Sequence, residues 1–553
     1  MKQITFEKSD YEQWKELAVQ SLKGKPFDTL ITTTIEDIDI QPLYIEGGNA
    51  NFSSIIREQK TNAGWTIAQG TYASNGAEWV FKVQESIEKG NEAIVYDGWK
   101  QMEWDETSLE KASELFTKYP IHFINIRKDD PILHVFNRIP EMNRKSVNGF
   151  IQTEQWNYAD KFPNLRKAGA DLWDIHHEGA DAVTELSIAL AKAAHLSNDA
   201  ESFEMFAANF YVRFAIDTHF FMEIAKLRAF RVLFHAFAEA YGVKNYPPVQ
   251  IAAVTSLRSF SKLDPYNNLL RAGNEAFAAV LGGADIITVH PHDVLTGPTN
   301  SSIRYSRNIQ LILKEETHVG KVADPAGGSY FIEQLTKELV EKAWELFIDI
   351  EQNGGLNAFI ASGRLAEQMD KRKAETATAK KALIGINVYA DSVAEIAEDW
   401  SGIKAFERIA SPFEMLHKKT AYDQPKTVLL NFGTLKDYKP RADYVTGFLS
   451  TGGIQCEWSP SFVNAAEACD WIHGKQVDYA IICAKDDIAQ TVVNDFLNRL
   501  PEEMIVDVAG KFDNNVTNSW TAKGLNGFIY KGQNILNKIE SILNKWKGEA
   551  DHE

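Results

Sequence analysis

Four histidines are the residues whose types and spacing first suggest chemistry. His290 and His292 stand two residues apart, and Asp293 follows directly. In a strand these two side chains would share one face, as two ligands of a single metal ion must, whereas in a loop they would serve as hydrogen-bonding groups. His176 and His177 are adjacent, so neither a helix nor a strand directs both at one metal. The sequence leaves a metal site open at the first pair and disfavours one at the second.

Two polar turns could frame a ligand. Residues 321–330 (KVADPAGGSY) form a turn rich in proline and glycine before a helix, and residues 264–271 (DPYNNLLR) lie where a strand leads into a helix. Active sites of (β/α)₈ barrels lie at such junctions. A structural explanation competes in both cases, because glycine supplies positive φ and Asp264 can cap a helix that begins at Pro265. No HExxH, P-loop, GxSxG or GxGxxG motif occurs.

The elements that must position these residues alternate between strands and helices. Short β-branched runs at residues 93–96, 121–125, 249–254 and 285–289 are separated by long helical stretches such as 181–194, 219–241 and 333–353. This alternation predicts an α/β fold whose first large domain, residues 51–389, is a (β/α)₈ TIM barrel. Residues 1–50 read as an arm with a short amphipathic helix at 11–22, and a helix that short is marginal alone.

A second α/β domain is predicted at residues 426–553. Five short runs, at residues 427–432, 453–456, 479–483, 504–508 and 527–530, alternate with helical segments. This pattern is typical of a flavodoxin-like doubly wound sheet. Residues 390–425 are charged, show a mainly helical pattern and are predicted to be a helical linker.

Composition excludes several classes of protein. The 553 residues are 44% hydrophobic and carry a net charge of -18, which suits a folded multi-domain protein and disfavours a nucleic-acid surface. The three cysteines show no CxxC spacing, so neither a disulfide framework nor a zinc site is expected. No apolar stretch is long enough to span a membrane, and the beginning of the sequence does not resemble a signal peptide. We therefore expect a cytoplasmic protein.

A family resemblance emerges from several motifs in the same order. Residues 304–310 (RYSRNIQ), followed by residues 321–330, resemble the methylmalonyl-CoA mutase signature, in which an ARNTQ-like helix precedes a KVADPWGGSY-like turn. Residues 22–25, 42–44, 179–182, 221–229 and 264–271 also agree. The resemblance covers nearly the whole chain. It implies a substrate-binding barrel, through which the CoA arm threads in active members, and a C-terminal cobalamin-binding domain.

The barrel departs from the family at its catalytic positions. Active members carry a tyrosine against the substrate in a TIRQYAG-like segment, but residues 66–72 read TIAQGTY, so Gly70 stands at that position and Ala68 replaces the arginine. Tyr72 lies two residues away. Active members also place a histidine twelve residues before the DPYNN-like motif, and here that position is Ala252. Ala326 replaces the tryptophan of the signature turn.

The cobalamin-type domain departs in the same way. The DxHxxG loop of active members, whose histidine ligates cobalt, corresponds to residues 435–440 (LKDYKP). Leu435 replaces the aspartate, Asp437 the histidine and Pro440 the glycine. The SxL element becomes Cys483-Ala484-Lys485, and the Gly-Gly element becomes residues 509–510 (AG). We expect Lys485 to fill the cavity that the nucleotide tail of the cofactor needs.

The resemblance and its departures lead to one interpretation. The chain is expected to be the small, non-catalytic subunit of an adenosylcobalamin-dependent methylmalonyl-CoA mutase, with no catalytic, cofactor-binding or metal-binding residue of its own. Its expected partner is the catalytic large subunit, which would carry the adenosylcobalamin. The alternative is that this chain is itself an active acyl-CoA mutase with a divergent site. A third interpretation is a regulatory binder of acyl-CoA.

Overall fold

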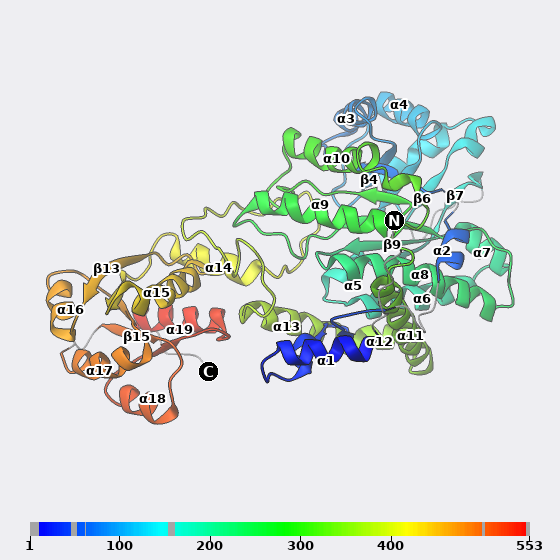
Figure 1. Cartoon of the computed structure of the whole chain (residues 1–553). Helices are drawn as coiled ribbons and strands as arrows, with labels where there is room; N and C mark the ends of the chain where they lie inside the picture. Colours follow the sequence, from blue (N-terminus) through cyan, green and yellow to red (C-terminus); the bar gives the residue numbers. More distant parts are fainter. Residues whose placement is uncertain (1–9, 46–51, 61, 153–160, 500–503, 549–553) are drawn as a thin grey trace, which may run out of the picture. The chain divides into compact units, whose positions relative to one another are not determined.

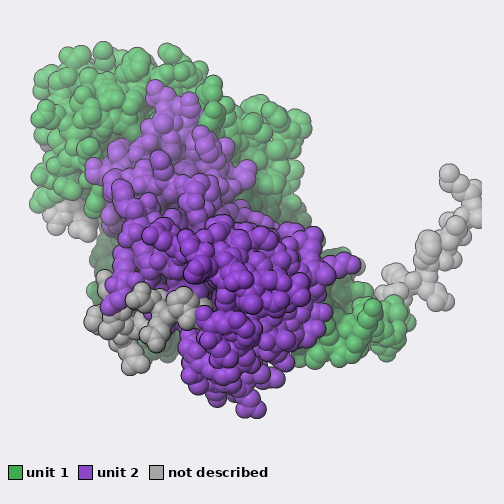
Figure 2. Space-filling model, turned by 90° about the vertical axis from the view of Figure 1, so that its left-hand side faces the viewer, with its two compact units in different colours: residues 1–256, 272–290, 303–368 green, residues 257–271, 291–302, 369–553 purple. Residues whose placement is uncertain are grey.

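The protein forms two compact α/β units. The structure is a computed structural model that describes residues 10–45, 52–60, 62–152, 161–499 and 504–548. Figure 2 colours the two units separately. Unit 1 comprises residues 1–256, 272–290 and 303–368, and unit 2 comprises residues 257–271, 291–302 and 369–553.

Unit 1 is built on a parallel sheet that closes on itself (Figure 1). β11 pairs with β3, β7 pairs with β6, and β8 pairs with β9. Since β7 and β8 are two halves of one segment, residues 165–171, the ring contains eight strand segments and confirms the predicted TIM barrel. Its strands are β3 (Thr66–Gly70), β4 (Ala93–Asp97), β5 (Ile121–Ile124), β6 (Gly149–Ile151), β7 (Leu165–Arg166), β8 (Ala168–Asp171), β9 (Phe210–Ile216), β10 (Gln250–Thr255) and β11 (Ile286–Thr288).

Helices follow the barrel strands. Side-chain caps begin several of them: Asn75, Asp105, Asp181 and Ser329 each accept a hydrogen bond from a backbone N–H of the first turn. α9, α10 and α13 each contribute residues to both units. The α-helices are α2 (Ser53–Glu58), α3 (Gly76–Glu88), α4 (Glu106–Phe116), α5 (Trp173–His177), α6 (Ala182–Asn198), α7 (Phe203–Asn209), α8 (Phe220–Ala240), α9 (Pro265–Leu281), α10 (Asn300–Glu315), α11 (Tyr330–Gln352), α12 (Gly355–Ala361) and α13 (Arg364–Ala377), and the 3₁₀ helices are η2 (Pro131–Arg138), η3 (Glu141–Ser146) and η5 (Val319–Lys321).

The described part of the N-terminal arm has a docked half and an undocked half. The docked half contains the hairpin of β1 (Thr32–Thr33) and β2 (Asp39–Ile40), the buried Ile38, and Tyr44, whose ring lies 5.1 Å from that of Phe331. The preceding helix α1 (Tyr11–Ser21) contains no buried residue. A 3₁₀ turn, η1 (Phe27–Leu30), joins them.

Unit 2 contains a five-stranded parallel sheet in the order β13-β12-β14-β15-β16. This order is the flavodoxin-like one, and it confirms the predicted second fold. One hydrophobic cluster packs against each face of the sheet. The elements are β12 (Thr427–Phe432), β13 (Cys456–Phe462), β14 (Tyr479–Cys483), β15 (Ile505–Ala509), β16 (Gly527–Ile529), α14 (Ser411–Thr420), α15 (Leu435–Ser450), α16 (Ala465–Ile472), α17 (Asp486–Leu497), α18 (Asn514–Thr521) and α19 (Ile535–Lys547).

Two predicted elements differ from the structure. The strand predicted at residues 453–456 begins only at Cys456, because Gly453 turns with φ +76° and Ile454 is buried in the core. The stretch predicted to be a helical linker contains one helix, α14, and residues 391–410 are not helical. The apolar residues that suggested a helix there pack individually, as Ile396 does against the hydrophobic core. Among the described residues, no helix is long and apolar enough to cross a membrane.

Candidate functional site

The signature turn at residues 321–330 is held by a buried arginine. Arg228 on α8 forms ion pairs with Asp324 of the turn and, at 2.7 Å, with Glu333 on α11. All three side chains are almost fully buried. Glu333 also accepts hydrogen bonds from the Gly328 backbone N–H and the Ser53 hydroxyl. The turn therefore has a structural role, because the Arg228 charge on α8 is neutralised by carboxylates about a hundred residues later in the sequence.

The turn at residues 264–271 also has a structural role. The Asn268 side chain accepts a hydrogen bond from the Ser261 N–H and donates to the carbonyl oxygens of Ser261 and His292. Pro265 is the first residue of α9, as predicted. The Asn268 amide thus joins two loops of unit 2, and its hydrogen-bonding groups are already used within the protein.

The catalytic tyrosine position of the family lies at the carboxyl end of β3. A Cβ atom on Gly70 would lie 3.1 Å from the hydroxyl of Tyr72. The Tyr72 ring therefore occupies the space beside Gly70. On the neighbouring residue, the Gln69 side chain accepts a hydrogen bond from Arg307 of the 304–310 motif at 2.6 Å, which holds α10 against the strand.

Ala252 faces the centre of the barrel, where large side chains fill the space. It belongs to a buried cluster with Phe150, Tyr211 and small or aliphatic residues of four other strands. The rings of Phe150 and Tyr211 stack with their centroids 4.2 Å apart. The ring of His122 also packs against Phe150, with the two centroids 3.4 Å apart. The aromatic layer, defined as His122, Phe150 and Tyr211, leaves the barrel interior packed at the level of Ala252.

Several polar groups at the barrel's carboxyl end were missed by sequence reasoning. Arg213 on β9 pairs with Asp171 at 2.8 Å and lies over the Trp173 ring. Burial, with a contribution from the Arg213 charge, lowers the pKa of His290 to about 3. Burial also raises the pKa of Asp97, which accepts a hydrogen bond from Asn125. These residues belong to or follow different strands and share no sequence motif. Only the barrel fold, which brings the carboxyl ends of the strands together, could have indicated a shared site.

The two histidine pairs make other contacts. Among the described residues, no group of three or more His, Cys, Asp or Glu side chains could hold a metal ion. His290 belongs to unit 1 and His292 to unit 2, where it stacks on Tyr266. His176 is buried and bonds to Glu185 at 2.7 Å and to Ser256 at 2.8 Å.

The His176 contacts extend into a buried charge network. Lys226 lies 2.9 Å from Glu185 and 2.6 Å from Glu223. Burial raises the pKa of Glu223 to about 7. The serine, histidine and glutamate have the order of a hydrolytic triad, but Ser256 is fully buried and does not line any of the cavities described here. We assign the network to the stability of the barrel.

In unit 2 the position of the cobalt ligand serves a helix cap. Asp437 accepts hydrogen bonds from the N–H and hydroxyl of Thr434, forming a capping box at the start of α15. The Thr434 hydroxyl and N–H are the main reason that the pKa of Asp437 is lowered. Leu435 is the exposed first residue of this helix, and Pro440 lies within it.

The neighbouring loops at the carboxyl edge of the sheet are joined by Arg441. Its guanidinium donates to the Ala484 carbonyl and to Asp486, and a Cβ atom on Gly510 would lie 3.0 Å from it. Cys483, the last residue of β14, is fully buried. Lys485 was expected to fill the tail cavity, but its side chain is 54% exposed and pairs with Asp437 and Asp487. Arg441, which the sequence did not single out, crosses this edge instead.

Comparison with known proteins identifies the family of this chain. The family model described as methylmalonyl-CoA mutase matches residues 138–425, more than half of the chain. The chain belongs to the methylmalonyl-CoA mutase family. That membership accounts for the shared motifs around Arg228 and Asp324, which the structure brings together.

Several relatives carry names that distinguish the subunits. The methylmalonyl-CoA mutase small subunit of Porphyromonas gingivalis is 26% identical over 97% of both chains. The probable methylmalonyl-CoA mutase small subunit of Mycobacterium tuberculosis (strain H37Rv) is 33% identical over 64% of this chain and 62% of its own length. Mouse mitochondrial methylmalonyl-CoA mutase is 27% identical over 71% of this chain and 63% of its own. The match to the mycobacterial and mouse relatives thus covers less than two thirds of their length.

Proposed function

We propose that this chain is the non-catalytic small subunit of a heterodimeric, adenosylcobalamin-dependent methylmalonyl-CoA mutase in the cytoplasm. The complex would interconvert succinyl-CoA and (R)-methylmalonyl-CoA, with the chemistry and the cofactor on a catalytic large subunit. The observation that carries the proposal is the packed barrel interior. Ala252 lies against the aromatic layer, and Gly70 lies beneath the Tyr72 ring.

The missing side chains remove the expected chemistry from this barrel. Neither Gly70 nor Ala252 has a side-chain donor that could act on a thioester carbonyl. Loss of one general-acid group typically lowers a rate by about 10²–10⁴-fold. Filled space supports the same proposal, because a substrate at the level of Ala252 would have to displace Phe150 or Tyr211.

The residues of unit 2 do not fit cobalamin. A lower cobalt ligand must present a free imidazole, but the corresponding Asp437 is a carboxylate engaged with Thr434 and Lys485. Arg441 of α15, the helix that follows β12, donates to the loop after β14, and β12 and β14 meet at the switch point of the sheet, where ligands of such folds bind. These contacts support placing the cofactor on the partner.

A structural subunit contributes by association, since a partner that binds only the folded state stabilises it by mass action. The arm is our candidate contact. α1 buries none of its residues in this chain, and its Leu17 side chain is 66% exposed. An amphipathic helix of this length is marginal in isolation. Deleting residues 1–46 should weaken association with the large subunit. An unchanged dissociation constant would remove the arm from the interface.

The direct test is turnover of succinyl-CoA to methylmalonyl-CoA with adenosylcobalamin. The purified chain alone should be inactive, and its mixture with the large subunit should be active. Turnover by the chain alone would contradict the proposal. A mixture no more active than the large subunit alone would contradict the stabilising role.

A second candidate rests on Tyr72. Its hydroxyl occupies the space beside Gly70, so the chain places a phenol near the family's tyrosine position by a different route. The alternative is therefore an active acyl-CoA mutase with a divergent site. If the chain alone shows turnover, Tyr72→Phe separates the cases, because only a catalytic phenol would make this variant inactive.

A further inference from the structure

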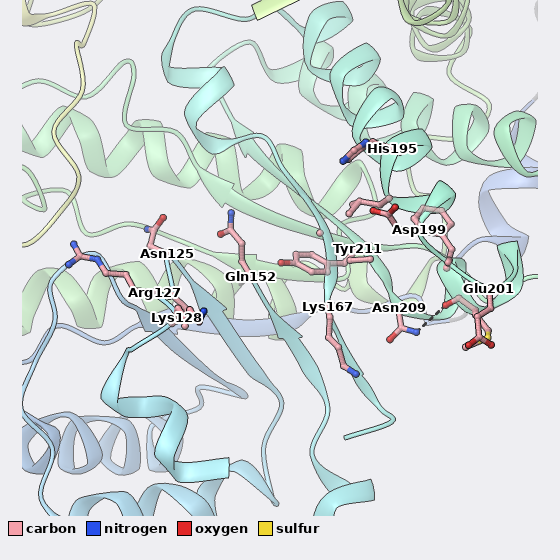
Figure 3. A pocket seen from close by; sticks show the side chains of 17 residues that line it. Asn125, Arg127, Lys128, Gln152, Lys167, His195, Asp199, Glu201, Asn209 and Tyr211 are labelled. Atoms are coloured by element: carbon pink, nitrogen blue, oxygen red, sulfur yellow. Dashed lines mark hydrogen bonds between the residues drawn. The ribbon is translucent and has the colours of Figure 1, made fainter. Parts of the chain in front are cut away.

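A cavity of about 1070 Å³ with both polar and apolar walls opens in unit 1, away from the family positions (Figure 3). Its walls come from the loop after β5, the end of β6, the junction of β7 with β8, the end of α6, α7 and β9. Neither Gly70 nor Ala252 lines it. Its size is comparable with known small-molecule sites, which enclose roughly 300–1,000 Å³.

Tyr211 offers an unused hydrogen-bonding group to this cavity. The residue is 1% exposed, and its hydroxyl has no hydrogen-bond partner among the described residues. Stacking on Phe150 fixes the ring, and burial raises the pKa of the phenol, so the hydroxyl stays protonated and can donate. Buried polar groups are nearly always paired, so a missing partner points to a bound molecule or water. The Gln152 side-chain oxygen, also without a partner in the described chain, lines the same space.

Positive charge lies on the side of the cavity that the hydroxyl faces. In Figure 3 the Tyr211 hydroxyl points toward Gln152, with Asn125 and Lys128 on the same side, whereas the Arg127 side chain extends away from the hydroxyl. Lys128 comes from the exposed loop after β5. An ammonium group beside neutral donors matches the oxygens of a phosphate or carboxylate.

The opposite wall has a different character. Met205 and Phe206 supply apolar surface, Asp199 and Glu201 supply carboxylates, and Lys167 adds one ammonium group. The cavity is suited to a molecule with an anionic group at one end and an apolar or donor-bearing remainder.

We infer that this cavity binds a small organic anion whose phosphate or carboxylate group lies against Lys128 and the Tyr211 hydroxyl. The remainder of the molecule lies along Met205 and Phe206 toward Asp199. The site is separate from the isomerase chemistry and does not depend on the proposed subunit role. Phosphates and carboxylates share the required anionic oxygens, and binding experiments distinguish them.

Isothermal titration calorimetry on the full chain tests the inference, with O-phosphoethanolamine as the phosphate probe and 4-aminobutyrate as the carboxylate probe. Each carries an ammonium group that suits the acidic wall. We expect at least one to bind, and the tighter one identifies the anionic group. Lys128→Gln and Tyr211→Phe should each weaken it by about tenfold, as loss of a charge-assisted hydrogen bond does.

Two controls make the result specific. Lys89→Gln removes one positive charge from an exposed ion pair outside the cavity and should leave binding unchanged. Tyr211→Phe breaks no hydrogen bond identified in the described chain, so its unfolding midpoint should match the parent's. The inference is overturned if neither probe binds at roughly 10 mM or if all variants bind equally, since the cavity would then hold only solvent.

Discussion

Arg228→Met tests whether the family signature turn is held by its buried ion pairs. The substitution keeps most of the side-chain volume but leaves Asp324 and Glu333 buried without their cation. Removing one partner of a buried ion pair typically costs about 3–5 kcal/mol. Two carboxylates lose their partner here, but Glu333 keeps its bonds to Gly328 and Ser53, so we take about 4 kcal/mol. With a urea slope of about 3 kcal/mol per M, the midpoint should fall by about 1.3 M.

Urea unfolding followed by far-UV circular dichroism measures this shift, with the transitions of the two units fitted separately. Arg364→Met is the matched control, because it breaks an exposed pair with Asp349 in the same unit and should cost at most about 1 kcal/mol. The triple variant Arg228→Met, Asp324→Asn, Glu333→Gln should recover most of the loss, since no buried charge stays unpaired. If Arg228→Met costs no more than the Arg364 control, the buried pairs do not hold the turn.

Three further outcomes follow from the described contacts. Ala252→His, which restores the family histidine, should lower stability by about 1–3 kcal/mol through overpacking against the aromatic layer and give no turnover of succinyl-CoA. Asp437→His should leave the visible spectrum of added aquacobalamin unchanged, because Arg441 still joins the neighbouring loops; a spectral shift on titration would contradict this reading. The Glu223 carboxyl has a folded-state pKa near 7, above its unfolded value of about 4.3, so the folded state binds the extra proton and stability contributed by this group declines as pH rises from about 4.5 to 7. Glu223→Gln should flatten that part of the stability profile measured by urea unfolding, and parallel profiles for variant and parent would refute the assignment.

The barrel could be predicted wherever its strands bury both faces. β4, β5 and β10 are nearly continuous runs of buried apolar residues, which is how strands of a covered parallel sheet read. The segment at residues 165–171 escaped prediction because it contains no β-branched residue. Its small residues are explained only by the fold, since a Cβ atom on Gly169 would lie 2.4 Å from the Tyr211 ring.

The candidate site shows the same division between local and distant information. The residue types at positions 70, 252 and 437 could be read directly against the family motifs. The groups that occupy the vacated space could not, because Tyr211 and Arg441 reach their neighbours across dozens of residues. The Tyr211 cavity lacked any sequence motif, since its walls come from six separate elements.

The segment formed by β7 and β8, residues 165–171, is a weakly hydrogen-bonded seam in the barrel. Only two residues pair toward β6 and four toward β9, and the Lys167 N–H between them bonds to the Asn209 carbonyl. Local opening takes place where the fewest bonds must break, so deuterium should enter the backbone amides of residues 165–171 earlier than those of β9 and β10. The cavity spans this seam, with Gln152 on one flank and Tyr211 on the other. A molecule bound in the cavity would contact both sides of the seam and stabilise its closed state. Binding should therefore slow deuterium uptake by the amides of residues 165–171.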